Sequence, residues 1–357
     1  MRILAPNDPA LNALEALLAQ RVDWGTSVTI IPWENYRDVL METLQADVPA
    51  YELVCVPGHI WLPELATAGY LAPLDDLASG AALQAYNKAD LLPLAAREGY
   101  YEDRWYMCPL FSDGHIVFYD PELIALEGDV PTLSTLRVAE LAAAHHNPPN
   151  RYGIALKAHP SEICLDFLPY LREAGATLLT ANSPEGIAAL ERYCALRAYA
   201  PPDTHTYGNA EIAAAIQQGK VALATTWGGQ AAPLYLPKNS GYRAAVFPKP
   251  WNATWGLCIP AHVADKAAAA ELLLQVTGPD VDPGVITAAG SPVRISSYTL
   301  ENVKTYPWLA AQRKMLETAE MLPLRPDLGI YLGAVTEAVT AAFTGQKTPA
   351  EALGGLP

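Results

Sequence analysis

Residues 51–77 of the chain read YELVCVPGHIWLPELATAGYLAPLDDL. Within this stretch, the apolar run Leu53–Val56 predicts a short buried strand, and the Pro-Gly pair after it predicts a turn. The turn delivers His59 and Trp61 to the start of a short helix. Ligands in open α/β sheets bind outside the carboxyl ends of the strands, so an aromatic residue at this place indicates a ligand contact.

The segments around this strand alternate between strand and helix patterns. The predicted order is a strand at 2–5, a helix at 10–21, a strand at 27–31, a helix at 35–45 and the strand at 53–56. Leu11, Leu14, Leu17 and Leu18 fall on one stripe of the first helix. This β-α-β-α-β order favours a largely parallel sheet with helices on both faces.

The pattern changes in residues 104–120, which read RWYMCPLFSDGHIVFYD. Two strand-like pieces, Trp105–Cys108 and Ile116–Tyr119, flank Pro109 and the polar Ser112-Asp113-Gly114. This arrangement indicates a crossing between two domains rather than a hairpin within one. The alternation then restarts, with helices predicted near 134–145, 162–174, 184–197, 210–218 and 266–275 and strands near 153–156, 220–225, 244–247 and 255–259.

Four phrases of the sequence resemble one family, in the same order along the chain. They are ELATAGYLAPLDD at 64–76, SDG at 112–114, NATWGLCIP at 252–260 and PLRPDLGIYLGAVTEAVTAAFTGQKTPAEAL at 323–353. The chain thus resembles the family 1 extracellular solute-binding proteins, the sugar receptors of ATP-binding cassette (ABC) importers, of the maltose- and trehalose-binding kind. One departure is the family's usual GGWGLAIP, whose paired glycines are absent here.

The resemblance implies an α/β, periplasmic-binding-protein-like fold, in which two α/β lobes joined by a three-crossing hinge hold the ligand in a cleft. The expected N-terminal lobe is 1–110 plus 256–297, the C-terminal lobe is 116–250 plus 303–357, and the crossings lie near 111–115, 251–255 and 298–302. The resemblance also implies an extracytoplasmic, monomeric receptor without catalysis or cofactor. It would bind a mono- or oligosaccharide and deliver it to the membrane permease subunits of an ABC importer.

The composition of the chain limits the classes of binding partner that the protein could have. The 357 residues carry a formal net charge of −15 and no run of Lys or Arg, which disfavours nucleic acid and anionic membrane surfaces. No apolar run approaches the ~18–20 residues of a membrane span. Residues 1–20 lack the pattern of a secretory leader, so the resemblance implies either that a leader was removed or that this chain departs from the exported pattern.

The five cysteines form no CxxC pair. Cys55, Cys108 and Cys258 lie in strand-like runs and are interpreted as small core residues. Cys164 and Cys194 fall on successive predicted helices, and a disulfide between them is left open.

A saccharide presents CH-rich ring faces and a rim of hydroxyl groups, so its receptor needs aromatic platforms and polar groups at their edges. The aromatic candidates are Trp33, Trp61, Trp227, Trp251 and Trp255. Each could instead be a large core side chain, which is the interpretation favoured for Trp105 and Trp308. The resemblance favours stacking on ligand for Trp227 and Trp255.

The polar candidates for ligand binding are Asn7, Asp8, His59, Asp113, His115, Glu162 and Arg294. The resemblance implies that Arg294 reaches the ligand, where it could donate two hydrogen bonds to vicinal hydroxyl groups. Asn7 and Asp8 could instead cap the helix that follows them. Asp113 could bond its own turn, and Glu162 could act only on the dipole of the helix that it opens.

Motifs for other chemistry are absent from the sequence. No HExxH, Cys/His cluster, GxSxG, GxxxxGK[ST] or GxGxxG pattern occurs, so neither a catalytic site nor a transition metal is predicted. Two alternatives stay open. The same fold could cage a quaternary ammonium or other organic cation among its tryptophans. A carbohydrate-active hydrolase would instead need two cleft carboxyl groups about 5–10 Å apart.

Overall fold

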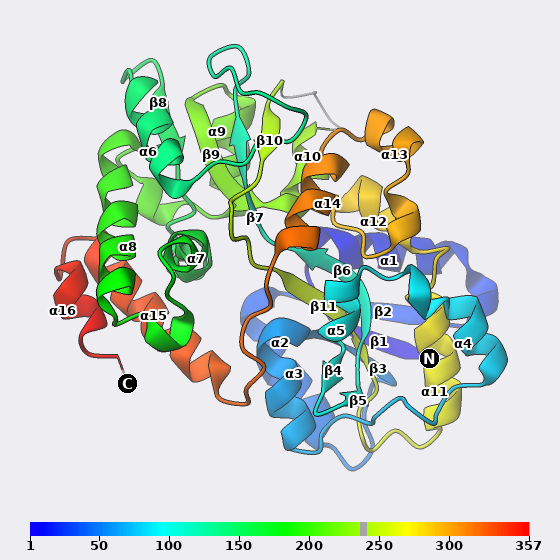
Figure 1. The fold of residues 1–357 in the computed structure, drawn as a ribbon. Coiled ribbons are helices and arrows are strands. Elements are labelled where there is room, and N and C mark those ends of the chain that lie inside the picture. Colours follow the sequence, from blue (N-terminus) through cyan, green and yellow to red (C-terminus); the bar gives the residue numbers. More distant parts are fainter. Residues whose placement is uncertain (236–240, 357) are drawn as a thin grey trace. The chain divides into compact units, whose positions relative to one another are not determined.

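The computed structural model describes residues 1–235 and 241–356. The chain forms two compact units (Figure 1). Unit 1 consists of Met1–Asp113, Asn252–Tyr306 and Met321–Pro326, and unit 2 consists of Gly114–Trp251, Pro307–Glu320 and Asp327–Pro357.

The chain passes between the units at 113/114, 251/252 and 306/307, and residues 321–326 return to unit 1. Hydrogen bonds within unit 1 hold residues 298–302 in that unit. The Tyr298 hydroxyl donates to the carbonyl of Pro292 at 2.7 Å, and the Asn302 amide donates to the carbonyl of Ser297 at 3.0 Å.

Unit 1 is built on a sheet whose order, among the described residues, is β2-β1-β3-β11-β6. Its strands are β1 (Arg2–Pro6), β2 (Ser27–Ile31), β3 (Leu53–Pro57), β6 (Cys108–Asp113) and β11 (Ala253–Cys258). β1 is parallel to β2 and β3, while β11 is antiparallel to both β3 and β6. The carboxyl ends of β1, β2, β3 and β6 and the amino end of β11 therefore share one edge of the sheet.

The connections of unit 1 are mainly helical (Figure 1). Its helices are α1 (Pro9–Gln20), α2 (Trp33–Gln45), α3 (Gly58–Thr67), α4 (Gly80–Tyr86), α5 (Pro93–Arg97), α11 (Lys266–Val276), α12 (Asp282–Ala288) and α13 (Leu300–Thr305). Short 3₁₀ turns lie at η1 (Val22–Trp24), η2 (Lys88–Asp90) and η7 (Ile295–Ser297), and β4 (Tyr100–Tyr101) pairs with β5 (Arg104–Trp105). Asp8 caps α1 through its side chain. Of the predicted leucine stripe of that helix, Leu11, Leu14 and Leu18 are buried, whereas Leu17 is only half-buried.

Unit 2 has a second sheet in the order β10-β7-β9-β8, as far as the described residues show. Its strands are β7 (His115–Tyr119), β8 (Tyr152–Ala155), β9 (Val221–Trp227) and β10 (Arg243–Ala245). β8 is parallel to β9, and β7 is antiparallel to both β9 and β10. The carboxyl ends of β8 and β9 therefore meet the amino end of β7.

Helices make up most of the rest of unit 2. They are α6 (Thr135–Ala144), α7 (Ile163–Glu173), α8 (Pro184–Ala195), α9 (Asn209–Gln217), α10 (Ala231–Tyr235), α14 (Leu309–Thr318), α15 (Leu328–Phe343) and α16 (Pro349–Leu353). The 3₁₀ turns are η3 (Leu178–Thr180), η4 (Leu196–Tyr199), η5 (Thr204–Thr206) and η6 (Gly228–Gln230). α15, near the C-terminus, packs against α7, α8 and α16.

One predicted strand is wrong. Trp105–Cys108 is not continuous: β5 ends at Trp105, and β6 begins at Cys108 and runs to Asp113. Proline is rare inside sheets because it cannot donate to the ladder. Pro109 is accommodated because it lies opposite Gly256, where the register with β11 shifts.

The core predictions for cysteine and tryptophan are confirmed. Cys55, Cys108 and Cys258 are buried, as are Trp105 and Trp308. Cys164 and Cys194 are both free thiols, so the disulfide left open between them is not formed.

Gly114 is required by packing at the start of unit 2. A Cβ at this position would lie 2.2 Å from the carbonyl oxygen of Trp251 and 2.8 Å from the sulfur of Met315. A backbone carbonyl cannot move aside as the end of a flexible side chain can. Only glycine therefore fits at position 114, where the chain leaves β6.

None of the helices in the described part of the chain is both long enough and apolar enough to cross a membrane.

Candidate functional site

In unit 1, aromatic side chains gather at the sheet edge where β2 and β3 end. Trp33 begins α2 two residues after β2, and Trp61 lies in α3 directly after β3. Trp255 lies on β11 opposite Pro57 on one side and opposite Phe111 on the other. The alternation of strand and helix therefore brings residues from distant parts of the sequence to one place.

These rings form one contiguous cluster. The indoles of Trp33 and Trp61 stack with centroids 5.5 Å apart and planes at 6°. Trp255 meets Trp33 edge-on at 5.5 Å and stacks on Phe111 at 5.9 Å. Trp33 is 46% exposed and Trp255 is half-buried, so both keep surface for a ligand, whereas Trp61 is nearly covered.

Charged and polar groups border this cluster. The guanidinium of Arg37 lies 4.9 Å above the Trp61 ring and forms an ion pair of 2.7 Å with Glu64. The imidazole of His59 is buried, and its ring centroid lies 6.2 Å from that of Trp255. Burial lowers the pKa of His59 to about 3, so the ring is neutral at pH 7.

Three further predicted residues lie at the same edge of the sheet. Asp8 fills the capping role, since its carboxylate accepts from the backbone N–H of Ala10 at 2.8 Å, and burial raises its pKa to about 6. Asn7 is exposed and accepts from the side chain of Asn12 at 3.0 Å. Asp113 is the last residue of β6, where its side chain is mostly buried.

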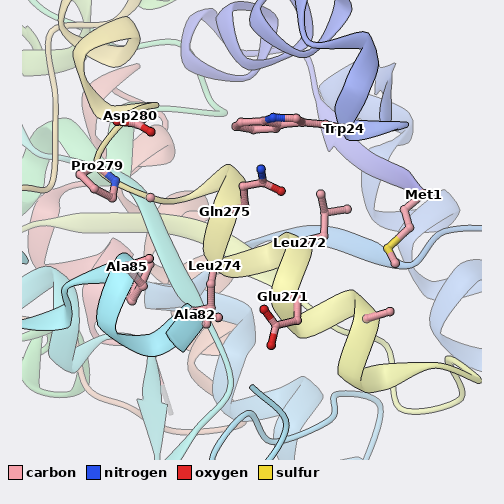
Figure 2. Close-up of a pocket in the computed structure, with 13 residues that line it drawn as sticks. Met1, Trp24, Ala82, Ala85, Glu271, Leu272, Leu274, Gln275, Pro279 and Asp280 are labelled. Atoms are coloured by element: carbon pink, nitrogen blue, oxygen red, sulfur yellow. The ribbon is translucent and has the colours of Figure 1, made fainter. Parts of the chain in front are cut away.

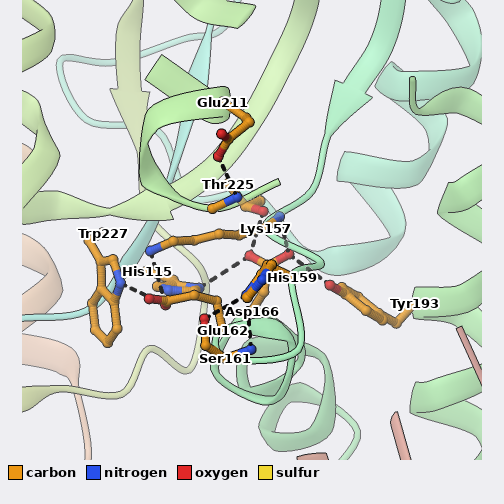
Figure 3. Close-up of polar contacts among 11 residues, drawn as sticks. His115, Lys157, His159, Ser161, Glu162, Asp166, Tyr193, Glu211, Thr225 and Trp227 are labelled. Carbon is orange, nitrogen blue, oxygen red and sulfur yellow. Dashed lines mark hydrogen bonds and ion pairs between the residues drawn. The ribbon is translucent and has the colours of Figure 1, made fainter. Parts of the chain in front are cut away.

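In unit 2, a second cluster lies where β8 and β9 end (Figure 3). Trp227, the last residue of β9, pairs with His115, the first residue of β7, and the two rings meet edge to face at 4.6 Å. The indole N–H of Trp227 donates to Glu162 Oε2 at 3.1 Å. Lys157 Nζ lies 3.1 Å from the same oxygen and 4.8 Å from the centre of the Trp227 ring.

Below this cluster, the carboxylate of Asp166 on α7 is buried and accepts three hydrogen bonds (Figure 3). The donors are the Thr225 hydroxyl at 2.6 Å, the Tyr193 hydroxyl at 2.9 Å and the backbone N–H of Lys157 at 3.1 Å, and His115 Nδ1 lies 3.2 Å from the same carboxylate. Burial lowers the pKa of His115, although Asp166 opposes this shift. Asp166 thus ties α7 to α8, to β9 and to the segment that follows β8.

Two predicted ligand residues lie elsewhere. Arg294 is 0% exposed, and its guanidinium donates to the carbonyls of Thr277 at 2.9 Å and Asn87 at 3.3 Å. It also forms an ion pair with the carboxylate of Asp90 at 3.7 Å. It is a core residue of unit 1, so its expected role toward ligand hydroxyl groups is not supported. Trp251 is also fully buried and packs against Trp227 at 5.3 Å.

Sequence reasoning missed several residues of these clusters. Phe111, Arg37, Lys157 and Asp166 were not expected to be part of a site. The position of Lys157, two residues after β8, is the same kind of signal that selected Trp61, and it could have been found in this way.

A separate pocket of about 580 Å³ occurs in unit 1 (Figure 2). It lies between α4 and α11, and the indole of Trp24 forms part of its wall. Among the described residues, its lining includes none of the predicted ligand contacts. The described residues also contain no group of three or more His, Cys, Asp or Glu side chains that could hold a metal ion.

Solved structures share this fold. A solute-binding protein of an ABC transporter from Agrobacterium radiobacter K84, in complex with ribitol, is 21% identical, with a TM-score of 0.85 over 99% of this chain and 96% of that one. Maltose-bound MalE3 of T. maritima is 19% identical, with a TM-score of 0.84 over 99% and 97%. A protein from Agrobacterium vitis S4 with bound D-mannitol is 21% identical, with a TM-score of 0.82 over 99% and 95%.

These structures confirm the predicted periplasmic-binding-protein-like fold. No curated protein matches the sequence. The family model described as bacterial extracellular solute-binding protein matches residues 13–282, which is most of the chain. The chain therefore belongs to the bacterial extracellular solute-binding proteins, a family of receptors and not of enzymes.

Proposed function

We propose that this protein is an extracytoplasmic receptor that binds a saccharide or polyol and delivers it to the permease subunits of an ABC importer. The observation that carries the proposal is the indole cluster of each unit, with hydrogen-bonding side chains beside it. Indoles offer flat apolar faces to the CH groups of a sugar ring or polyol chain, and the polar groups serve its hydroxyls.

The proposed ligand residues follow from their positions in and beside the two clusters. In unit 1 they are Trp33, Trp61 and Trp255, with Asn7, Asp8, His59 and Asp113 for hydroxyl groups. In unit 2 they are Trp227, Glu162 and His115. Trp251 is assigned the supporting role of packing behind Trp227. Arg294 is left out because it is fully buried and both of its terminal nitrogens donate to carbonyls within the core of unit 1.

The family membership and the ligands of the similar structures support this proposal. Those structures hold ribitol, D-mannitol and maltose, all of them rich in hydroxyl groups. The fold has two units between which the chain passes several times, which suits closure around a ligand by a hinge. We propose that the receptor acts as a monomer.

The alternative of an organic-cation ligand is disfavoured by charges of the protein itself. Arg37 lies 4.9 Å above the Trp61 ring, and Lys157 lies 4.8 Å from the centre of the Trp227 ring. A ring that already faces a cation is a weaker partner for a second one, and the two positive charges repel. Neutral ligands meet no such penalty.

Calorimetry on purified protein tests the proposal. Co-purified ligand is first removed by unfolding and refolding, and the protein is then titrated with ribitol, D-mannitol, maltose, maltotriose and choline. Binding of at least one of the saccharides or polyols in preference to choline is expected. Binding of choline alone would overturn the ligand class while leaving the receptor assignment intact.

A further inference from the structure

Lys157 is the most unusual residue of the unit 2 cluster. Its side chain is 0% exposed, and lysine is almost never buried without a partner because removing an ammonium from water is costly. The charge is met by Glu162 Oε2 at 3.1 Å and by the face of Trp227 at 4.8 Å (Figure 3). Its backbone is fixed as well, because its N–H donates to Asp166.

Glu162 is held through only one of its two oxygens. Both Lys157 Nζ and the Trp227 indole N–H reach Oε2, each at 3.1 Å. No hydrogen bond to Oε1 is made within the described part of the chain, and the Glu162 side chain keeps 22% exposure. The ion pair and the hydrogen bond on this one oxygen hold the carboxylate in its orientation and leave the other oxygen as an acceptor.

We propose that Lys157 is a positioning residue that holds Glu162 so that Oε1 accepts a hydroxyl group of the ligand, and that this arrangement selects neutral, hydroxyl-bearing ligands over anionic ones. The inference rests on the proposed function, whose ligand site it refines. A hydroxyl group donates to a fixed carboxylate oxygen, and such charge-assisted bonds are short and strong. The carboxylate or phosphate of an acidic sugar has no proton to donate at neutral pH.

The charges around the cluster act in the same direction. The cluster holds the two carboxylates of Glu162 and Asp166 and the ammonium of Lys157, which pairs with Glu162, whereas Asp166 accepts from the backbone N–H of Lys157. His115 adds no positive charge, because burial lowers its pKa. An anionic ligand group beside Oε1 would therefore meet net repulsion in a partly buried place, where screening by salt is weak.

The test combines two substitutions in a double-mutant cycle. The variants are Lys157→Met, Glu162→Gln and both together, titrated by calorimetry with ribitol, D-mannitol and maltose. Lys220→Met is the matched control, since Lys220 is an exposed lysine of the same unit. Each single variant is expected to weaken binding about 10- to 100-fold, the scale of one lost charge-assisted hydrogen bond.

Coupling separates a positioning role from a merely structural one. If Lys157 acts through Glu162, the double variant binds no more than about twofold more weakly than Glu162→Gln alone. The positioning role would be overturned if the loss of affinity in the double variant equals the product of the two single losses. It would also be overturned if Lys157→Met binds the ligand like wild type. Circular dichroism of each variant shows whether it is folded.

Selectivity is measured on the wild type and does not depend on any variant folding. D-Mannitol is compared with mannitol 1-phosphate and D-gluconate, and the anions are expected to bind at least about 100-fold more weakly. Glu162→Gln should narrow this ratio. Equal affinity for D-mannitol and its anionic counterparts would overturn the inference alone, whereas failure of every saccharide and polyol to bind would overturn the proposed function and this inference with it.

Discussion

Substitution of Glu98 by glutamine is expected to change the pH dependence of folding in a direction that the structure determines. Glu98 follows α5, and its side chain is 0% exposed. Its Oε2 accepts from the Asn252 amide at 2.6 Å, and the neighbouring hydroxyls of Ser112 and Thr254 are 2.9 Å apart. No cation is paired with Glu98 among the described residues, and burial raises its pKa from 4.5 to about 8, against the hydrogen bonds of Thr254 and Asn252.

The sign follows from proton binding. Between pH 4.5 and pH 8 the folded protein keeps a proton on Glu98 that the unfolded chain has released. Stability conferred by this site is therefore present at low pH and is lost as the pH rises through that window. The loss amounts to about 1.4 kcal/mol per pH unit for a full proton, so wild type is expected to lose a few kcal/mol between pH 5 and pH 8 from this residue.

Glutamine keeps the shape of a protonated glutamate and cannot ionise. Urea unfolding of wild type and Glu98→Gln is measured at half-unit steps from pH 5 to pH 8, with Glu15→Gln, an exposed residue of α1, as the control. The difference in the free energy of unfolding should grow with pH in favour of Glu98→Gln. A difference that is flat, or that grows in favour of wild type, would show that Glu98 is ionised in the fold.

Three further predictions follow from the packing and from the proposed site. Trp227→Ala and Trp255→Ala should each weaken saccharide binding by roughly 1–3 kcal/mol with little unfolding, measured by calorimetry, and unchanged affinity in both would remove the indoles from the site. Gly114→Ala should lower stability by about 1–3 kcal/mol in thermal unfolding, because the added Cβ meets backbone atoms. Gly284→Ala is the control and should leave stability unchanged, because its Cβ meets nothing within 4 Å. Equal melting temperatures of the two variants would contradict this packing. Saturating ligand should reduce the radius of gyration in solution scattering, and an unchanged radius would argue against hinge closure.

Local patterns were enough to predict most elements. The β-branched run Ser27–Ile31 is a strand with the predicted bounds, and Asp8 caps α1 as its position allowed. The break at Pro109 was misread because the residue that accommodates it, Gly256, lies far away in the sequence. A single strand does not reveal which partner it will have.

The surroundings of the site residues were hidden from sequence reasoning for the same reason. Arg294 lies in a phrase that resembles a ligand-binding segment, but its partners Asn87 and Thr277 belong to other segments of unit 1. Lys157 was overlooked because an isolated lysine after a strand is usually solvated. Only the fold shows that Glu162 and Trp227, which is 65 residues further along the chain, enclose it.

The two clusters are held in place by different forces, and this difference assigns them different tasks within the proposed function. In unit 1, Trp33, Trp61 and Trp255 are fixed mainly by contacts with other rings, which give broad apolar surface with little directionality. In unit 2, the carboxylate of Glu162 is held by the hydrogen bond from the Trp227 indole and by the ion pair with Lys157, and a hydrogen bond to a carboxylate is strongly directional. Substitutions of the unit 1 rings should therefore lower the affinity for all ligands by similar factors. Substitutions of Lys157 or Glu162 in unit 2 should instead alter which ligands are preferred.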